Sequence, residues 1–281
     1  MPSLRFVLAP RGYFAFEPVA LLCFRTSMCG IGASATIFLC VGVLRRRPYD
    51  KYTGKISKSQ TEGSLREIRT LKNIYNKELN EQLEASLSST SDSHLINLED
   101  IMIHLHYNPV LRQIPDIQTR FWEQVIVDAL INNNDRNNGN WGILYEEGKY
   151  KLAPVFDNGA AFYNKLPDSK LSEYLADAAK FQQSADMSRT VFALNGKPLM
   201  AKDLTLIENA DFYETAAKLI PLIQSRLNEI AAFIHQIPEK YQDLPICSEA
   251  RKQFYVQSIA YRLDNFLLPV YEKAIKTAKA L

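Results

Sequence analysis

The clearest pattern along the chain is the helical spacing of its apolar residues. Four apolar side chains fall at positions i, i+4, i+8 and i+9 of the segment from Asp116 to Ile131, namely Ile117, Phe121, Val125 and Ile126. This spacing predicts a helix with a buried face, and Asp116 is placed to cap its first turn. Helical spacing of apolar or charged residues predicts helices in four further segments, Leu65 to Ala85, Leu98 to Leu105, Ala210 to Gln236 and Glu249 to Lys279. Beyond about Leu171 almost all of the chain is expected to be helical, with a kink or break at Pro221.

The pattern changes after the helix that ends near Ile131. Residues 132–140, NNNDRNNGN, contain no apolar side chain, so a loop is expected there. Two short strands, Trp141 to Tyr145 and Lys149 to Val155, follow the loop and are joined by the turn residues Glu146-Glu147-Gly148. Together these patterns predict an α+β fold that is mostly α-helical and carries a short β-hairpin.

The first fifty residues differ in composition from the rest. They hold six arginines and no lysine, whereas 18 lysines and nine arginines follow from Lys51 onward. Three of the four cysteines, Cys23, Cys29 and Cys40, also lie in this part. The contrast predicts an atypical N-terminal segment over residues 1–62 and a second unit over residues 63–281.

Within that first segment, Ser27 to Leu44 is an uncharged run of 18 residues, followed at once by Arg45-Arg46-Arg47. A helix that crosses a membrane needs about 20 apolar residues, and flanking arginines favour the cytoplasmic side. Three interpretations stay open: a membrane anchor, a buried or irregular segment, and non-native sequence from a wrong start, a frameshift or a gene fusion.

The overall composition narrows the class of protein. With 47% hydrophobic and 23% charged residues, the chain has the composition of a globular protein. A net charge of +2 gives no reason to expect direct binding to nucleic acid. Four cysteines without a CxxC pair predict neither a disulfide framework nor a zinc site, so we expect a cytoplasmic protein unless residues 27–44 anchor it in a membrane. The histidines show no ligand spacing, and His104 and His106 are expected on a helix surface.

The chemical content lies in the polar loop and in the segment after the hairpin. Phosphoryl transfer from a nucleotide depends on carboxylates and amides that hold Mg²⁺ on the phosphates and orient the attacking hydroxyl. In kinase-like sites the orienting Asp is followed five positions later by an Asn ligand, which is the spacing of Asp135 and Asn140. Asp157 stands seventeen residues after Asn140, behind the hairpin, in the sequence Phe156-Asp157-Asn158-Gly159. Gly159 is expected to let the backbone turn sharply after Asp157. Taken singly, each of these residues is typical of an ordinary turn, but their order after an apolar helix favours a site.

Two phrases carry a family resemblance. The segments IPDIQTRFWEQVIVDALINNNDRNNGNWGIL and KLAPVFDNGAAF resemble the C-terminal lobe of HipA-like serine/threonine kinases. The resemblance is specific between Ile114 and Phe162 and extends from about Gly63 to the C-terminus. Arg136 and Asn137 stand where many relatives have other residues. The phosphatidylinositol kinases share the Asp-Arg-x-x-x-Asn logic, so the motif alone leaves a lipid substrate open.

The resemblance implies a protein-kinase-like C-terminal lobe and a role for each motif residue. Asp135 is implied as the catalytic residue that orients the substrate hydroxyl, and Asn140 and Asp157 as the Mg²⁺ ligands that bind ATP through the metal. The implied partners are ATP, a protein substrate, an antitoxin, and a separate chain that supplies an N-terminal lobe.

That N-terminal lobe is not recognisable in the sequence. Kinases hold the α- and β-phosphates with a lysine on a strand, and the first lysines are Lys51, Lys55 and Lys58, in a polar segment without strand character. Gly30-Ile31-Gly32 is a weak candidate for a phosphate loop because it has no third glycine. The alternative to an active HipA-type kinase is therefore a catalytically inactive C-lobe that acts, if at all, as a helical binding module.

Overall fold

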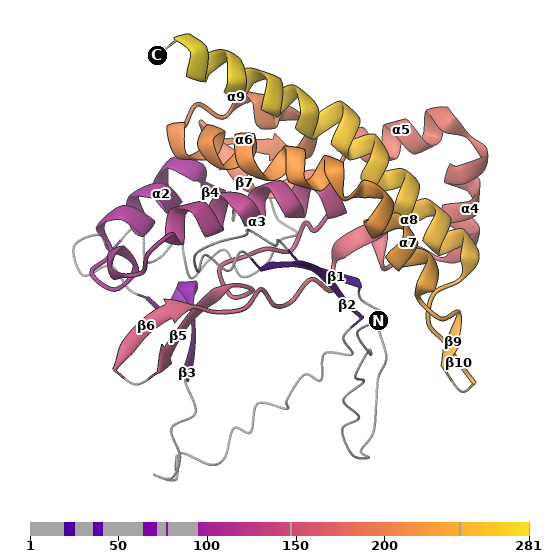
Figure 1. The fold of residues 1–281 in the computed structure, drawn as a ribbon, viewed down its shortest axis with the longest axis horizontal. Helices are drawn as coiled ribbons and strands as arrows, with labels where there is room; N and C mark the ends of the chain where they lie inside the picture. The colour runs from indigo at the N-terminus through magenta and orange to yellow at the C-terminus, as the bar shows by residue number, and fades with distance from the viewer. Residues whose placement is uncertain are drawn as a thin grey trace.

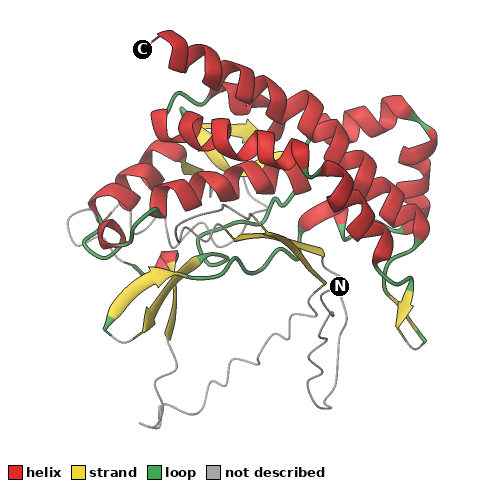
Figure 2. Cartoon of the chain, in the orientation of Figure 1, coloured by secondary structure: helices red, strands yellow, loops and turns green. Residues whose placement is uncertain are grey.

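The computed structural model describes residues 20–25, 36–41, 64–71, 77, 95–146, 148–241 and 243–280. Its α-helices are α2 (Leu98–Tyr107), α3 (Ile117–Ile131), α4 (Asp168–Ala176), α5 (Ala178–Asp186), α6 (Ala210–Ser225), α7 (Leu227–Gln236), α8 (Glu249–Arg262) and α9 (Leu268–Ala280). Its strands are β1 (Ala20–Arg25), β2 (Thr36–Val41), β3 (Ser64–Glu67), β4 (Ile96–Asn97), β5 (Gly142–Glu146), β6 (Lys149–Leu152), β7 (Arg189–Leu194), β8 (Lys197–Met200), β9 (Lys240–Tyr241) and β10 (Leu244–Pro245). The helices gather in one part of the molecule, and the sheet that contains β5 and β6 projects away from them (Figures 1 and 2). The expected fold class, α+β and mostly helical, is confirmed.

Helix α3 forms the centre of the core. It packs against α2, α6, α8 and strand β7, and most of its side chains are buried, including those of Phe121 and Trp122. A helix that is apolar on nearly all faces must be covered from several sides. The expected cap is only partly right, because Asp116 occupies the N-cap position with a left-handed backbone and its side chain makes no capping hydrogen bond. At the other end Asn132 adopts the left-handed conformation (φ 55°) and its N–H donates to the Asp128 carbonyl, which ends the helix and starts the polar loop.

The hairpin after that loop forms as expected and gains a third strand. Strands β5 and β6 pair antiparallel with Tyr145 opposite Tyr150, and β3 pairs antiparallel with the other edge of β5. Gly142 lies opposite Glu67 at this edge. A Cβ atom on Gly142 would lie 2.3 Å from the Arg66 carbonyl oxygen, so the close approach of β3 requires glycine here.

The structure corrects two expectations in the N-terminal part. The predicted helix from Leu65 to Ala85 is wrong at its start, because 64–67 form β3, and residues 68–70 form the short 3₁₀ turn η1. Backbone pairing with β5 outweighs the local helical pattern. The candidate membrane helix over 27–44 is also wrong where it is described, because Thr36–Val41 is a strand paired with Ala20–Arg25. No helix in the described stretches combines the length and apolar character needed to cross a membrane.

Other expectations for this part fall outside the described residues. They are the boundary near residue 62, the Gly30–Gly32 segment, the three lysines Lys51, Lys55 and Lys58, and most of the remainder of the predicted 65–85 helix. The division into units 1–62 and 63–281 stays a prediction.

A second hairpin, β7–β8, interrupts the region that was expected to be helical. Its turn residues Asn195 and Gly196 both have positive φ, 51° and 72°. Asn-Gly is the preferred pair for such two-residue turns, so the sequence did carry a signal for this hairpin. Strand β4 pairs parallel with β7, and the Gly196 N–H donates to the Asn97 side chain at 2.9 Å. The small sheet thereby closes over one side of α3.

The C-terminal helices follow the predicted apolar stripes with different breaks. Pro221 lies inside α6, and the break between α6 and α7 comes at Arg226 instead. The predicted segment from Glu249 to Lys279 is helical throughout, but a π-helical turn, η6 (Leu263–Leu267), separates α8 from α9. Such turns are rare and are often found at functional positions.

Candidate active site

The site is organised around a buried ion pair between Asp128 and Arg136. Asp128 lies in the last turn of α3, and Arg136 lies in the loop that follows. The guanidinium donates from Nε to Oδ2 at 2.9 Å and from Nη2 to Oδ1 at 3.1 Å. The exposed fractions of the two side chains are 10% for Asp128 and 3% for Arg136. Two parallel hydrogen bonds of this kind fix both position and orientation.

The remaining donors of Arg136 connect two separate segments. Nη1 donates to the Asn140 carbonyl at 2.7 Å and also to the Phe156 carbonyl. Nη2 also donates to the Asn158 side-chain oxygen. One buried side chain thus joins the loop that carries Asp135 and Asn140 to the segment that carries Asp157.

Several asparagines of the loop are used to build it. Asn133 is buried and donates to Asp128 Oδ1 at 2.9 Å, while its own side-chain oxygen accepts from the Asp135 N–H at 3.4 Å. Asn138 is buried and accepts from the Trp141 indole N–H at 3.1 Å. These contacts explain why a loop without apolar residues packs directly against an apolar helix: its polar groups are hydrogen-bonded.

Asp135 and Asn140 have side chains held by near neighbours. Asn137 donates to Asp135 Oδ1 at 3.1 Å, and its own oxygen accepts from the Gly139 N–H at 2.9 Å. The Asn140 amide nitrogen donates to the Asp135 carbonyl at 2.6 Å. Because the nitrogen is engaged, the Asn140 Oδ1 atom is the one left to act as a ligand.

Asp157 is exposed, and its backbone is left-handed, with φ 53°. The expected turn at Gly159 forms, since the Ala161 N–H donates to the Asn158 carbonyl at 3.1 Å, but the positive φ falls on Asp157 and not on Gly159. A non-glycine residue in this region costs on the order of 1–3 kcal/mol and is typical of functional sites. Asn158, next to it, is buried and anchored to Arg136, and this contact holds the strained residue in place.

The donor set suits Mg²⁺ with nucleotide phosphates as further ligands. Within the described ranges no three His, Cys, Asp or Glu side chains gather as a metal site. Mg²⁺ is commonly held by one or two carboxylates plus substrate phosphates and water. The Asp157 carboxylate and the Asn140 oxygen are of this type, so these residues fit the ion.

The sequence identified the motif residues but not what holds them together. Asp128 is the only charged residue in the apolar run from Val125 to Ile131, and a single carboxylate in such a run is the signal that could have revealed a buried ion pair. Arg136 was noted only as a departure from relatives, whereas it joins the two segments that carry the motif residues.

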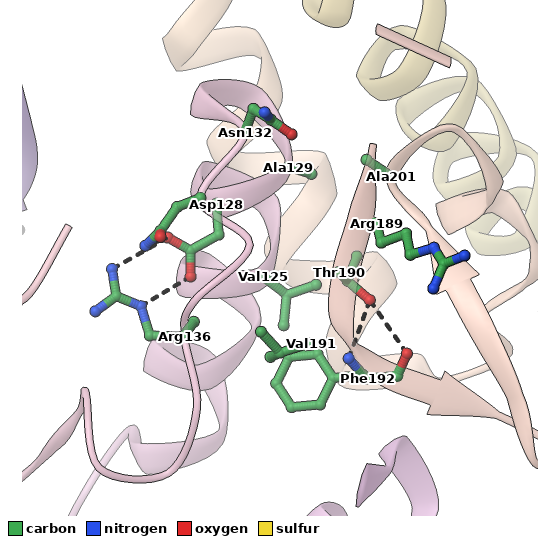
Figure 3. Close-up of a pocket in the computed structure, with 11 residues that line it drawn as sticks. Val125, Asp128, Ala129, Asn132, Arg136, Arg189, Thr190, Val191, Phe192 and Ala201 are labelled. Carbon is green, nitrogen blue, oxygen red and sulfur yellow. Dashed lines mark hydrogen bonds and ion pairs between the residues drawn. The ribbon is translucent and has the colours of Figure 1, made fainter. Parts of the chain in front are cut away.

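A hollow lies on one side of this ion pair (Figure 3). Asp128 and Arg136 line one wall, and Thr190 and Phe192 of β7 line the opposite wall. Its volume of about 10 Å³ is near the space that one water molecule needs. It is therefore a packing gap and not a site for a nucleotide.

Comparison with known proteins supports a kinase relationship. No protein-family model matches the chain. The chain is 28% identical over 166 residues to the serine/threonine-protein kinase CtkA of Helicobacter pylori, a match that covers 56% of this chain and 47% of that kinase. The match thus spans about half the length of that curated relative.

The fold comparison agrees. The crystal structure of a Helicobacter pylori proinflammatory kinase CtkA has a TM-score of 0.62 to this chain, with 22% identity, and the likeness covers 77% of this chain and 73% of the other. The predicted kinase-like lobe is thereby confirmed as a fold, and the β5–β6 hairpin lies where the sequence predicted it.

Proposed function

We propose that the chain is a kinase that transfers the γ-phosphoryl group of ATP to a serine or threonine hydroxyl of a protein substrate. In this proposal Asp135 orients the hydroxyl, and Asn140 and Asp157 hold Mg²⁺ with ATP. The observation that carries it is the position of Arg136. Its guanidinium donates to the carbonyls of both Asn140 and Phe156, and this contact supports a single site built from the two sequence motifs.

The contacts of Asp135 support its role. One carboxylate oxygen is held by Asn137, which leaves the other to accept a hydrogen bond from the substrate hydroxyl. An oriented hydroxyl attacks the γ-phosphorus, its oxygen forms the new bond, the bond to the β-phosphate oxygen breaks, and ADP leaves. Asp135 accepts the hydroxyl proton. Bound Mg²⁺ would neutralise charge on the phosphates, with Asn140 and Asp157 as its protein ligands.

The finer predictions go with this proposal. Five further predictions belong to this proposal and stay predictions: a HipA-type affiliation, a toxin-like role, an antitoxin partner, a separate chain that supplies the N-terminal lobe, and a cytoplasmic location. The half-length match to a serine/threonine kinase supports the choice of a protein hydroxyl over a lipid.

The test is calorimetric titration of the full chain with ATP, with and without Mg²⁺, for the wild type and three variants. We expect Asp157→Ala to abolish the Mg²⁺-dependent binding of ATP. Asp135→Ala should keep that binding but lose phosphoryl transfer to a protein acceptor, because the two residues act at different stages. Asp264→Ala, at an exposed carboxylate on η6, is the matched control and should behave like the wild type.

Two outcomes would overturn the proposal. Equal, negligible binding by the wild type and all variants would support an inactive C-lobe instead. Binding that survives in Asp157→Ala would show that Mg²⁺-ATP binds elsewhere.

A further inference from the structure

A second buried arginine, Arg262, lies at the end of α8 and also contacts α3. Its guanidinium is fully buried. Nη1 donates to the Ala129 carbonyl at 3.1 Å and to the Ser188 hydroxyl at 2.9 Å. Nη2 donates to the Tyr163 hydroxyl at 3.1 Å. Arg262 therefore ties α8 and the last turn of α3 to the segment that follows Asp157.

Tyr163 is held at both ends of its side chain. Its hydroxyl accepts from Arg262 and donates to the Ser184 carbonyl at 2.6 Å. Its ring packs edge-on against Phe254, with 5.6 Å between ring centroids. These contacts fix Tyr163 to two elements that lie outside its own segment, α8 through Arg262 and Phe254 and α5 through Ser184.

The backbone at Tyr163 requires such a hold. Phe162 and Tyr163 are consecutive non-glycine residues with φ of 58° and 55°. Two bulky residues in the left-handed region persist only where the surroundings determine their conformation. Phe162 is buried and stacks on Tyr255 with 4.5 Å between ring centroids. Arg262, Ser184 and the aromatic rings thus stabilise a conformation that the sequence alone disfavours.

A series of tight turns connects Tyr163 to Asp157. The Ala161 N–H donates to the Asn158 carbonyl at 3.1 Å, and the Asn164 N–H donates to the Ala161 carbonyl at 3.2 Å. The Asn164 side chain also donates to the Gly159 carbonyl. Arg136 holds the beginning of this segment through Asn158, and Arg262 holds its end through Tyr163, so the conformation of Asp157 depends on both anchors.

We propose that Tyr163 is a positioning residue: its hydrogen bonds with Arg262 and Ser184 keep the segment from Asp157 to Tyr163 in the strained conformation that presents the Asp157 carboxylate to Mg²⁺. This inference rests on the proposed function for its metal. The hold on the segment itself does not depend on that function.

The test uses Tyr163→Phe, which removes the hydroxyl and keeps the ring. The matched control is Tyr213→Phe, since the Tyr213 hydroxyl also donates to a main-chain carbonyl, that of Ile207 at 2.7 Å, but lies on α6. We expect Tyr163→Phe to weaken Mg²⁺-dependent ATP binding by 10- to 100-fold, the range typical for partners that orient a metal ligand. ATP binding measured without Mg²⁺ should stay unchanged. A general loss of structure would weaken that binding as well, so the two explanations can be told apart.

A second measurement does not need a ligand. Hydrogen exchange of the amides from Asp157 to Leu166 should be at least about tenfold faster in Tyr163→Phe and unchanged in Tyr213→Phe. Equal exchange in both variants, or unaltered Mg²⁺-dependent binding in Tyr163→Phe, would overturn the inference. If the wild type itself does not bind Mg²⁺-ATP, the proposed function fails and the metal-positioning role fails with it. The exchange result then decides only whether Tyr163 holds the segment.

Discussion

Two buried arginines hold the same site in different electrostatic ways. Arg136 forms a paired contact with the Asp128 carboxylate. Arg262 donates only to neutral oxygens, those of Ala129, Ser188 and Tyr163, and lies 5.4 Å from the Phe266 ring centroid. Both guanidiniums meet the last turn of α3, one at a side chain and the other at a carbonyl.

The difference shows how each positive charge is stabilised. The charge of Arg136 is balanced by a full negative charge. The charge of Arg262 is stabilised by partial charges instead. Its partner Ala129 contributes one of the last four carbonyls of α3, which carry the negative end of the helix dipole, and aromatic rings add a weaker attraction. Burial lowers the pKa of Arg262, while Tyr163 and Asp186 favour its charged form. Losing a partner should therefore cost much more at Arg136 than at Arg262.

The largest effect is expected from Asp128→Ala, which removes the carboxylate partner of Arg136, the arginine whose charge is paired with an ion. It leaves the Arg136 guanidinium buried without a carboxylate, and removing one member of a buried pair costs about 3–5 kcal/mol. Urea unfolding followed by circular dichroism measures the loss. The double variant Asp128→Ala/Arg136→Met should recover part of it, because it removes the unpaired charge. A loss below about 1 kcal/mol would show that the ion pair does not anchor the loop.

His104 is a third buried basic side chain, and it extends the comparison because it is neutral in the folded protein and carries no charge that needs a partner. His104 was expected on a helix surface, but its ring is fully buried in α2 and neither ring nitrogen has a hydrogen-bond partner. Burial lowers the pKa of His104 from 6.5 to about 4. The unfolded chain therefore binds a proton between pH 6.5 and 4 while the folded protein does not, and stability falls as the pH falls through this range.

The size of this stability loss follows from the lowered pKa of His104. The free energy of unfolding should fall by about 3 kcal/mol between pH 6.5 and 4. In His104→Leu this part of the acid dependence should disappear, which thermal unfolding at a series of pH values can measure. The same slope in the variant and the wild type would assign the acid sensitivity to other groups.

The sequence predicted what local pattern determines. Periodicity and turn residues predicted the span of α3, the polar loop and the β5–β6 hairpin. Asp135 and Asn140 lie in that loop, as the sequence predicted. Strand β3 was missed because its pairing depends on Gly142, far along the chain. The β7–β8 hairpin was missed although Asn195-Gly196 is a local signal for it.

The buried charges could not be predicted in the same way. Whether Arg136, Arg262 or His104 is buried depends on packing between elements distant in sequence, and the spacing of residues within one segment does not contain that information. The left-handed backbone of Asp157 is a similar case. The local preference favours Gly159, but the anchors on both sides of Asp157 decide which residue takes the strain.

Replacing Arg262 tests the arginine whose hydrogen-bond partners are all neutral. Arg262→Met keeps the length of the side chain and removes the charge, so it leaves neutral acceptors instead of an unpaired ion. Replacing a buried charge by an apolar side chain is often close to neutral in stability. The Tyr163 and Ser188 hydroxyls keep their own hydrogen bonds to the Ser184 and Ala185 carbonyls, so neither hydroxyl is left without a partner. We expect a loss of no more than about 2 kcal/mol in urea unfolding. A loss as large as that of Asp128→Ala would mean that the two arginines do not differ in the way proposed.

The smallest effect is expected at an exposed ion pair that serves as the baseline for both arginines. Arg226 donates to Glu229 at 2.7 Å, and the exposed fraction of the Glu229 side chain is 65%. Water stabilises both charges when such a contact is lost, so exposed pairs contribute little. Glu229→Gln should change the free energy of unfolding by less than about 0.5 kcal/mol, and 1 M NaCl should remove even that difference. A loss comparable to that of Asp128→Ala would show that geometry, rather than burial, sets the contribution of ion pairs in this protein.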